Sequence, residues 1–165
     1  KTSRLESGVL AMTPKRHGIQ QLLDAASAQA APGAEAKAIT LTVEPTDLTA
    51  RFDPKWTAEA LYNLVDNAVK YTPAGGAVTL RAVGYELFCR VDVTDTGPGI
   101  PESEQARIFQ RFYRSPSASE AEGVGIGLYL ARQIAAGQGG YLKVSSRPGE
   151  GSTFSLFLPR AEERT

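Results

Sequence analysis

The spacing of apolar positions predicts helices and strands that follow one another without a regular repeat. Apolar residues recur at helical spacing across residues 18–31, and Pro32 and Gly33 are expected to end this helix. Alternating apolar and polar positions then predict strands at 39–43 and 48–53. The first third of the chain is therefore expected to form one helix followed by two short strands.

A second helix is expected to begin directly after the second strand. Asp53 is a favourable N-cap residue and Pro54 a favourable first-turn residue, so this helix is predicted to reach about Lys70. Segment 115–123 is small, polar and acidic, and it is expected to be a mobile loop. The other expected elements are strands at 77–85, 87–94, 141–146 and 153–158, and helices at 101–109 and 126–136.

This order of elements predicts an α+β fold. We expect a two-layer α/β sandwich, in which a mixed, mostly antiparallel sheet carries helices on one face. A length of 165 residues suits one domain with a sizeable core. The single cysteine, Cys89, excludes an internal disulfide and is expected to be a small buried hydrophobe.

The balance of charged residues limits the classes of partner that the chain is expected to attract. Lys and Arg total 18, as do Asp and Glu, so the chain has no basic field to attract nucleic acid or an anionic membrane. No apolar stretch approaches the roughly 20 residues of a membrane span. A bound phosphate would therefore have to be held by local geometry.

The second helix carries a polar face with unusual composition. At about 100° per residue, Glu59, Asn63, Asp66, Asn67 and Lys70 point in similar directions. A solvated face would give the same pattern, although asparagine is a poor mid-helix residue and adds no charge. Its oxygen suits a hard cation and its amide suits a phosphate oxygen, so this face is a candidate site for Mg²⁺ and a polyphosphate.

Two glycine-rich segments are further candidates. Residues 95–100 place an aspartate at a strand end beside a glycine turn, where it can accept a hydrogen bond from a ligand amine; an ordinary type II turn remains the alternative. Residues 123–127 open into a helix and expose backbone N–H groups to an anion; a flexible hinge is the alternative. Neither segment has the spacing of a P-loop or of a Rossmann fingerprint.

The asparagine-bearing helix and the two glycine-rich segments, in this order along the chain, resemble the catalytic domain of sensor histidine kinases. This domain belongs to the ATPase group that includes gyrase, Hsp90 and MutL. The resemblance extends over residues 48–159 and implies a Bergerat-type ATP-binding fold. The family's boxes correspond to residues 63–72 (N box), 95–100 (G1 box), 108–114 (F box), 123–128 (G2 box) and 151–154 (the Gly-x-Thr-Phe element).

The resemblance implies ATP and Mg²⁺ as ligands and assigns roles to matching residues. Asn63 and Asn67 would hold the metal and, with Lys70 and Arg114, make up the catalytic set. Asp95 would bind the adenine amine. The implied nucleotide-binding residues are Asn63, Asn67, Lys70, Tyr71, Asp95, Gly97, Gly99, Ile100, Arg114, Gly123, Gly125, Gly127, Leu128 and Thr153, with Thr153 supporting the adenine pocket.

A kinase of this family transfers the γ-phosphoryl group of ATP to a histidine on a dimerisation domain. The only histidine here is His17, which lacks the acidic helical context of that acceptor and is expected to be a surface residue before a helix. We therefore expect the acceptor on an absent dimerisation domain of the same protein. Residues 1–10 would be its remnant, 11–160 the ATP-binding domain and 161–165 a tail.

The expected protein is thus a cytoplasmic, monomeric fragment of a protein-histidine kinase, whose parent can be membrane-anchored and would signal to a response-regulator receiver domain. An anti-sigma-type serine kinase or a gyrase-like ATPase is one alternative. The latter would normally have glutamate at Asn63, and the F box disfavours both. A second alternative is a module of the same fold that binds nucleotide or a partner protein without kinase activity.

Overall fold

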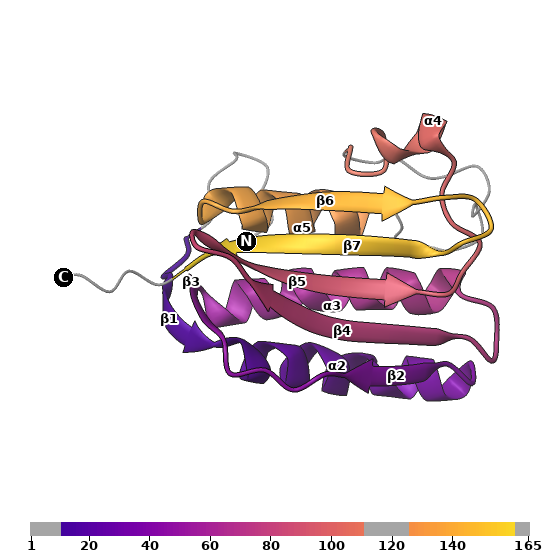
Figure 1. Cartoon of the computed structure of the whole chain (residues 1–165), viewed down its shortest axis with the longest axis horizontal. Coiled ribbons are helices and arrows are strands. Elements are labelled where there is room, and N and C mark those ends of the chain that lie inside the picture. Colours follow the sequence, from indigo (N-terminus) through magenta and orange to yellow (C-terminus); the bar gives the residue numbers. More distant parts are fainter. Residues whose placement is uncertain (1–10, 111–125, 161–165) are drawn as a thin grey trace.

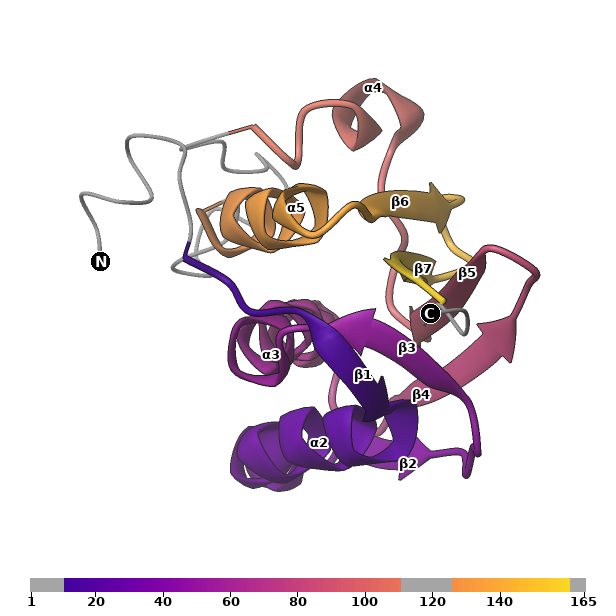
Figure 2. The same ribbon diagram turned by 90° about the vertical axis from the view of Figure 1, so that its left-hand side faces the viewer.

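A computed structural model describes residues 11–110 and 126–160, which form two layers (Figure 1). One layer is a five-stranded sheet, and helices α2 (Ile19–Ala36), α3 (Pro54–Tyr71) and α5 (Ile126–Gly137) cover one of its faces, as the turned view makes plain (Figure 2). The short helix α4 (Glu102–Gln105) lies beyond the β6 edge of the sheet (Figures 1 and 2). Within these ranges no helix is long and apolar enough to cross a membrane.

The large sheet confirms the expected α+β class. Its strand order is β2-β4-β5-β7-β6, and only the β2–β4 pair is parallel. The predicted strands are found within a few residues of their expected ends. Their bounds are β2 (Thr40–Val43), β4 (Ala77–Gly84), β5 (Phe88–Asp95), β6 (Tyr141–Ser146) and β7 (Ser152–Pro159).

A second sheet was not predicted. Strand β1 (Lys15–Gly18) pairs antiparallel with β3 (Thr49–Phe52), so the strand expected at 48–53 lies outside the large sheet. His17, expected at the surface, is half-buried in β1, with its ring 5.4 Å from that of Phe52. The four residues of β1 do not alternate between apolar and polar, so the sequence gives no local signal of a strand there. Pairing with β3, which is distant in the sequence, stabilises β1.

The core lies between the sheet and the helices. Alternate strand residues such as Val78, Leu80 and Leu156 are fully buried and form one cluster with Leu64 of α3. Cys89 belongs to this cluster, and burial raises the pKa of its thiol to about 11. The expectation of a small buried hydrophobe at this position is confirmed.

Helix α2 does not end where Pro32 and Gly33 were expected to end it. It continues to Ala36, with Ala30 and Ala34 buried on either side of the proline. Pro32 itself is exposed, so water can reach the carbonyl group that the missing N–H leaves without an intrahelical bond. Packing of the buried alanines therefore outweighs the local preference to stop.

Helix α4 is shorter than the predicted helix 101–109. It ends at Gln105, but the chain beyond it still packs inward, because Ile108 and Phe109 are buried. The Phe109 ring meets that of Phe154 edge to face at 6.2 Å. The predicted helix therefore extended too far at its C-terminal end.

The start of α3 agrees with prediction and ties three segments together. The Asp53 carboxylate accepts hydrogen bonds from the backbone N–H groups of Lys55 and Trp56, at 3.0 Å each, and from that of Thr13 at 2.7 Å. The Asp53 N–H donates to Oε1 of Gln138, just past α5, at 2.9 Å. Asp53 therefore fixes the first turn of α3 against both the N-terminal segment and the end of α5.

Replacement of Asp53 by alanine is expected to lower the free energy of unfolding by about 1–3 kcal/mol, because the change leaves N–H groups without their acceptor. Urea denaturation followed by circular dichroism measures the loss. Asp47→Ala is the matched control, since Asp47 is exposed and should change stability by less than about 0.5 kcal/mol. Equal losses for the two variants would contradict this account.

Candidate functional site

The predicted polar face of α3 has a buried part, which lines a cavity, and a more exposed part, which does not. Asn67 is only 7% exposed and lines a cavity. Asn63 is half-buried one turn earlier and does not line that cavity. Lys70 is exposed, and its Nζ lies 3.2 Å from Oδ2 of Asp66. Among the predicted cation and phosphate ligands on this helix, Asn67 is therefore the one directed into the cavity.

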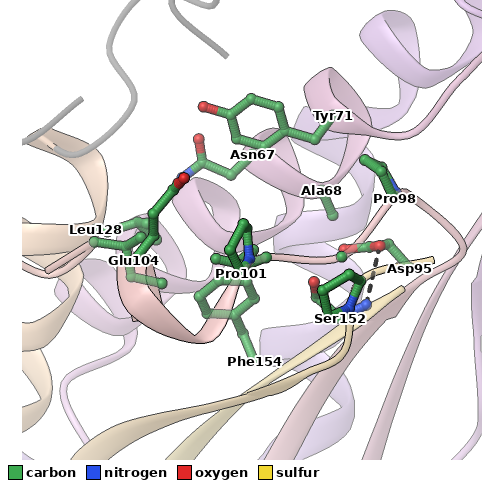
Figure 3. A pocket seen from close by; sticks show the side chains of 14 residues that line it. Asn67, Ala68, Tyr71, Asp95, Pro98, Pro101, Glu104, Leu128, Ser152 and Phe154 are labelled. Atoms are coloured by element: carbon green, nitrogen blue, oxygen red, sulfur yellow. Dashed lines mark hydrogen bonds between the residues drawn. The ribbon is translucent and has the colours of Figure 1, made fainter. Parts of the chain in front are cut away.

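The cavity has a volume of about 380 Å³ and lies where α3, the turn after β5, α4, the first turns of α5 and the start of β7 meet (Figure 3). The structure brings together six predicted site residues in its wall: Asn67, Tyr71, Asp95, Gly99, Ile100 and Leu128. It adds eight that sequence reasoning missed: Ala68, Pro98, Pro101, Glu104, Ile108, Pro148, Ser152 and Phe154. Most of the added residues are apolar, so the wall suits a flat, largely apolar ligand group.

Asp95 is the buried carboxylate of this cavity. It is 8% exposed, and its Oδ1 accepts the backbone N–H of Gly97 at 2.8 Å and that of Ser152 at 3.3 Å (Figure 3). Burial raises the pKa of Asp95, while these two hydrogen bonds oppose the rise. Because Oδ1 takes both backbone bonds given by the described residues, Oδ2 is the oxygen that a ligand amine can use.

The floor of the cavity depends on close approach of two turns. Gly99 has φ +83°, and a Cβ there would lie 2.1 Å from the carbonyl oxygen of Arg147. Gly151 has φ +82°, and a Cβ there would lie 2.2 Å from the carbonyl oxygen of Asp95. Glycine is therefore required at both positions by conformation and by space. The pairing of these turns holds Asp95 at the end of β5.

Thr153 does not lie in the cavity, contrary to the expectation that it supports an adenine pocket. Its hydroxyl is 3.1 Å from that of Thr94, and both residues line a separate polar hollow of about 210 Å³. The preceding residue, Ser152, lines the cavity instead. Successive strand residues face opposite sides of a sheet, so Ser152 faces the cavity and Thr153 faces the polar hollow.

Other predicted residues lie beside the cavity or beyond the described part of the chain. Gly97 forms the turn that bonds to Asp95 but does not line the cavity. Gly127 lies in the first turn of α5. Arg114, Gly123 and Gly125, together with the expected mobile loop at 115–123, lie outside the described residues.

The residues present fit a nucleotide with a divalent cation. The wall offers apolar surface, one buried carboxylate for an amine and the Asn67 amide for a cation or phosphate. The buried Oγ1 of Thr72, beside Gly97, has no hydrogen-bond partner among the described residues. No group of three His, Cys, Asp or Glu residues capable of holding a metal occurs in ranges 11–110 and 126–160. Asn67 would offer an amide oxygen to Mg²⁺, and the phosphates of a bound nucleotide would supply further oxygen ligands.

Comparison with known proteins identifies the family. Residues 52–162 match the family described as "Histidine kinase-, DNA gyrase B-, and HSP90-like ATPase". The chain belongs to this ATPase family. The matched range contains the whole of α3, the glycine turns and the sheet strands that surround the cavity.

Curated relatives of the chain include a sensory kinase and a sensor protein. The adaptive-response sensory kinase SasA of Synechococcus sp. (strain JA-3-3Ab) is 42% identical over 131 residues, which are 78% of this chain and 35% of that protein. The sensor protein DivL of Caulobacter vibrioides is 36% identical over 163 residues, which are 98% of this chain and 21% of that protein. The chain thus spans about a third or less of these relatives.

Solved structures of similar proteins agree with the fold. Full-length ShkA in complex with AMPPNP superposes with a TM-score of 0.83 at 29% identity, over 99% of this chain and 34% of that one. The mycobacterial sensor histidine kinase MprB superposes with a TM-score of 0.80 at 28% identity, over 90% of this chain and all of that one.

Asp95→Asn is expected to leave stability at pH 7 unchanged or to increase it. Asparagine retains an oxygen for both backbone N–H groups but carries no charge. With its pKa raised in the folded state, Asp95 binds its proton more tightly there than in the unfolded chain, so its ionisation costs stability as pH rises above the ordinary pKa of 3.8. Urea unfolding at several pH values tests this: any advantage of the variant should shrink as the pH falls towards 3.8. A clear loss of stability at pH 7 would contradict the conclusion that burial of the Asp95 charge outweighs its two backbone hydrogen bonds.

Proposed function

We propose that this chain is the ATP-binding catalytic domain of a two-component sensor histidine kinase. The observation that carries the proposal is the shared cavity, which has the Asn67 amide and the Asp95 carboxylate in one largely apolar wall. Family membership and the sensory kinase SasA among the relatives support it.

The two polar groups have different proposed partners. Asp95 accepts a hydrogen bond from the exocyclic amine of adenine, while Ile100, Leu128 and Phe154 enclose the base. Asn67, together with Asn63 on the preceding turn, holds Mg²⁺. When bound, Mg²⁺ would neutralise charge on the phosphates of ATP.

Further groups are proposed to contact the phosphates. Lys70 exchanges its partner Asp66 for a phosphate, since the ion pair is exposed and costs little to break. Arg114 and the backbone N–H groups of Gly123, Gly125 and Gly127 are proposed as further donors to the phosphates. These groups position the polyphosphate and stabilise charge on it, which is the main demand of phosphoryl transfer.

The phosphoacceptor is proposed to lie on another domain. His17 is in β1, at the end of the molecule away from α4 and the cavity, and packs on Phe52 (Figure 1). The attacking imidazole is proposed to belong to a histidine-bearing dimerisation domain of the same protein. Its nitrogen forms a bond to the γ-phosphorus as the bond to the bridging oxygen breaks, and ADP leaves.

The parent protein is proposed to pass the phosphoryl group to a response-regulator receiver domain. We infer a cytoplasmic location for this domain, because ATP and the receiver domains of such systems are found there. The isolated chain is expected to bind Mg-ATP as a monomer and to hydrolyse it slowly, since it lacks the acceptor.

Asn67→Ala is expected to weaken Mg-ATP binding by roughly tenfold or more, because it removes the amide from the cavity wall. Isothermal titration calorimetry with and without Mg²⁺ measures the effect, which should be largest with Mg²⁺ present. Lys55→Ala is the control, since Lys55 is exposed in the first turn of α3. Binding by Asn67→Ala equal to that of the wild type would contradict the proposed role.

Phosphotransfer tests the kinase activity itself. The dimerisation domain of the parent protein, supplied separately with its histidine, should gain acid-labile phosphate from γ-labelled ATP in the presence of this chain. The same domain with the histidine replaced by glutamine should gain none. Tight Mg-ATP binding without any transfer would support a nucleotide-binding module that lacks kinase activity.

A further inference from the structure

Three polar side chains form a row across the ends of neighbouring strands, at the Asp95 end of the cavity. Ser146 of β6 pairs in register with Ser152 of β7, and Ser152 pairs in register with Asp95 of β5. Residues directly opposite each other in antiparallel strands carry their side chains on the same face. Ser152 and Asp95 line the cavity (Figure 3), whereas Ser146 does not. Ser146 can therefore act on a ligand only through its neighbours.

The hydroxyl group of Ser146 uses all of its hydrogen-bonding capacity. Its Oγ accepts the backbone N–H of Ile100 at 2.7 Å and donates its one proton to the carbonyl of Gly151 at 3.0 Å. The Oγ of Ser152 lies 2.8 Å from the same oxygen. A serine hydroxyl has one proton and two lone pairs, so the second lone pair of Ser146 accepts the hydroxyl proton of Ser152. The direction of this third bond follows from the other two.

Ser146 is held in this role by the turns that it joins. Its bonds to Ile100 and Gly151 link the turn after β5 to the turn between β6 and β7. The side chain of Gln105 adds a clamp, because its Nε2 donates to the carbonyls of Ile100 at 2.8 Å and Ser146 at 3.0 Å. Rotation of the Ser146 hydroxyl would break two bonds to backbone groups, so Ser146 stays an acceptor for Ser152.

The orientation of the Ser152 hydroxyl determines what the cavity offers to a ligand. Ser152 is only 6% exposed, and with its proton directed to Ser146 it has lone pairs left for the cavity that it lines. Asp95 next to it offers Oδ2, which is also an acceptor. Two neighbouring acceptors suit an amino group, which has two N–H donors, and disfavour an oxo group, which is itself an acceptor. The row therefore favours a 6-aminopurine over a 6-oxopurine.

We propose that Ser146 is a positioning residue for base recognition: it takes the hydroxyl proton of Ser152 and so makes the cavity wall select a purine with a 6-amino group. The inference rests on the proposed function, because it assumes that the base of a nucleotide lies at Asp95. It adds to base recognition a residue that lies outside the cavity and contacts no ligand itself.

Ser146→Ala tests the proposal in calorimetric titrations with Mg-ATP and Mg-ITP, which carry the same phosphates and differ on the base edge that bears the 6-amino group. The wild type is expected to bind Mg-ATP more tightly. In the variant the Ser152 proton loses its acceptor and can turn into the cavity. The affinity for Mg-ATP should therefore fall roughly three- to tenfold, while that for Mg-ITP changes by less than about twofold. Ser146→Thr keeps the hydroxyl group and should retain the wild-type ratio of the two affinities.

A double-mutant cycle tests the route through Ser152. Ser152→Ala should itself lower the ratio of Mg-ATP to Mg-ITP affinity, because it removes one acceptor from the wall. Adding Ser146→Ala should lower this ratio no further, since no hydroxyl group is left to orient. Additive losses in the double variant would overturn the proposal, because they would show that Ser146 acts independently of Ser152.

Ser145→Ala is the matched control. Ser145 is exposed and pairs in register with Thr153, so the same hydroxyl group is removed from the opposite face of the sheet. Both affinities should stay unchanged in this variant. An unchanged ratio in Ser146→Ala would overturn the proposal, and so would equal losses for the two nucleotides, which would show only a general loosening of the turns. Failure of the wild type to bind Mg-ATP at all would instead refute the proposed function.

Discussion

Helix α3 has to serve the hydrophobic core and the candidate site with the same turns. Leu64 and Val65 are fully buried in the core, and Asn67 and Ala68 line the cavity only two or three residues later. Both ends of the helix are fixed, by the Asp53 cap at its start and by Lys37 Nζ, which donates to the Val69 carbonyl at 3.0 Å. A rotation that moved Asn67 out of the cavity would expose core leucines, so packing energy holds the amide in position.

The other side of the cavity depends on backbone packing. The turn after β5 and the turn between β6 and β7 approach so closely that Gly99 and Gly151 have no room for a Cβ. This contact brings the N–H of Ser152 to the carboxylate of Asp95, which stays buried although burial raises its pKa. A side-chain framework could yield by changing rotamers, whereas two backbones in contact cannot. Asp95 is thus held rigidly at a cost in stability that the surrounding core offsets.

The sequence was sufficient to predict the elements and the main residues of the site because both have local signals. Helical spacing, the Asp53-Pro54 cap and the glycine turns act over a few residues. Failures occurred where distant contacts decide the outcome: β1 exists only through its pairing with β3, and buried alanines carry α2 through Pro32. Such long-range packing cannot be read from neighbouring residues.

Side-chain direction was the least predictable feature of the site. A motif match selected Thr153, but one position in a strand changes the face of the sheet, and Ser152 is the residue in the cavity. The alternation of buried Phe154, Leu156 and Leu158 along β7 contains the signal that separates the two, since even-numbered residues face inward. Glu104 had no comparable signal, because four-residue α4 is too short to show a period.

Different interactions govern ligand binding at the two ends of the cavity. Around Asp95 the wall supplies shape, apolar contact and one directed hydrogen bond, none of which depends strongly on salt or on a cation. Near Asn67 the described wall supplies an amide, which suits a cation or a phosphate oxygen, so binding at this end depends on charge and on salt. Because the chain has equal numbers of acidic and basic residues, no general field adds to these local contacts. Recognition of the base and binding of the phosphates can therefore change independently, although α3 contributes to both.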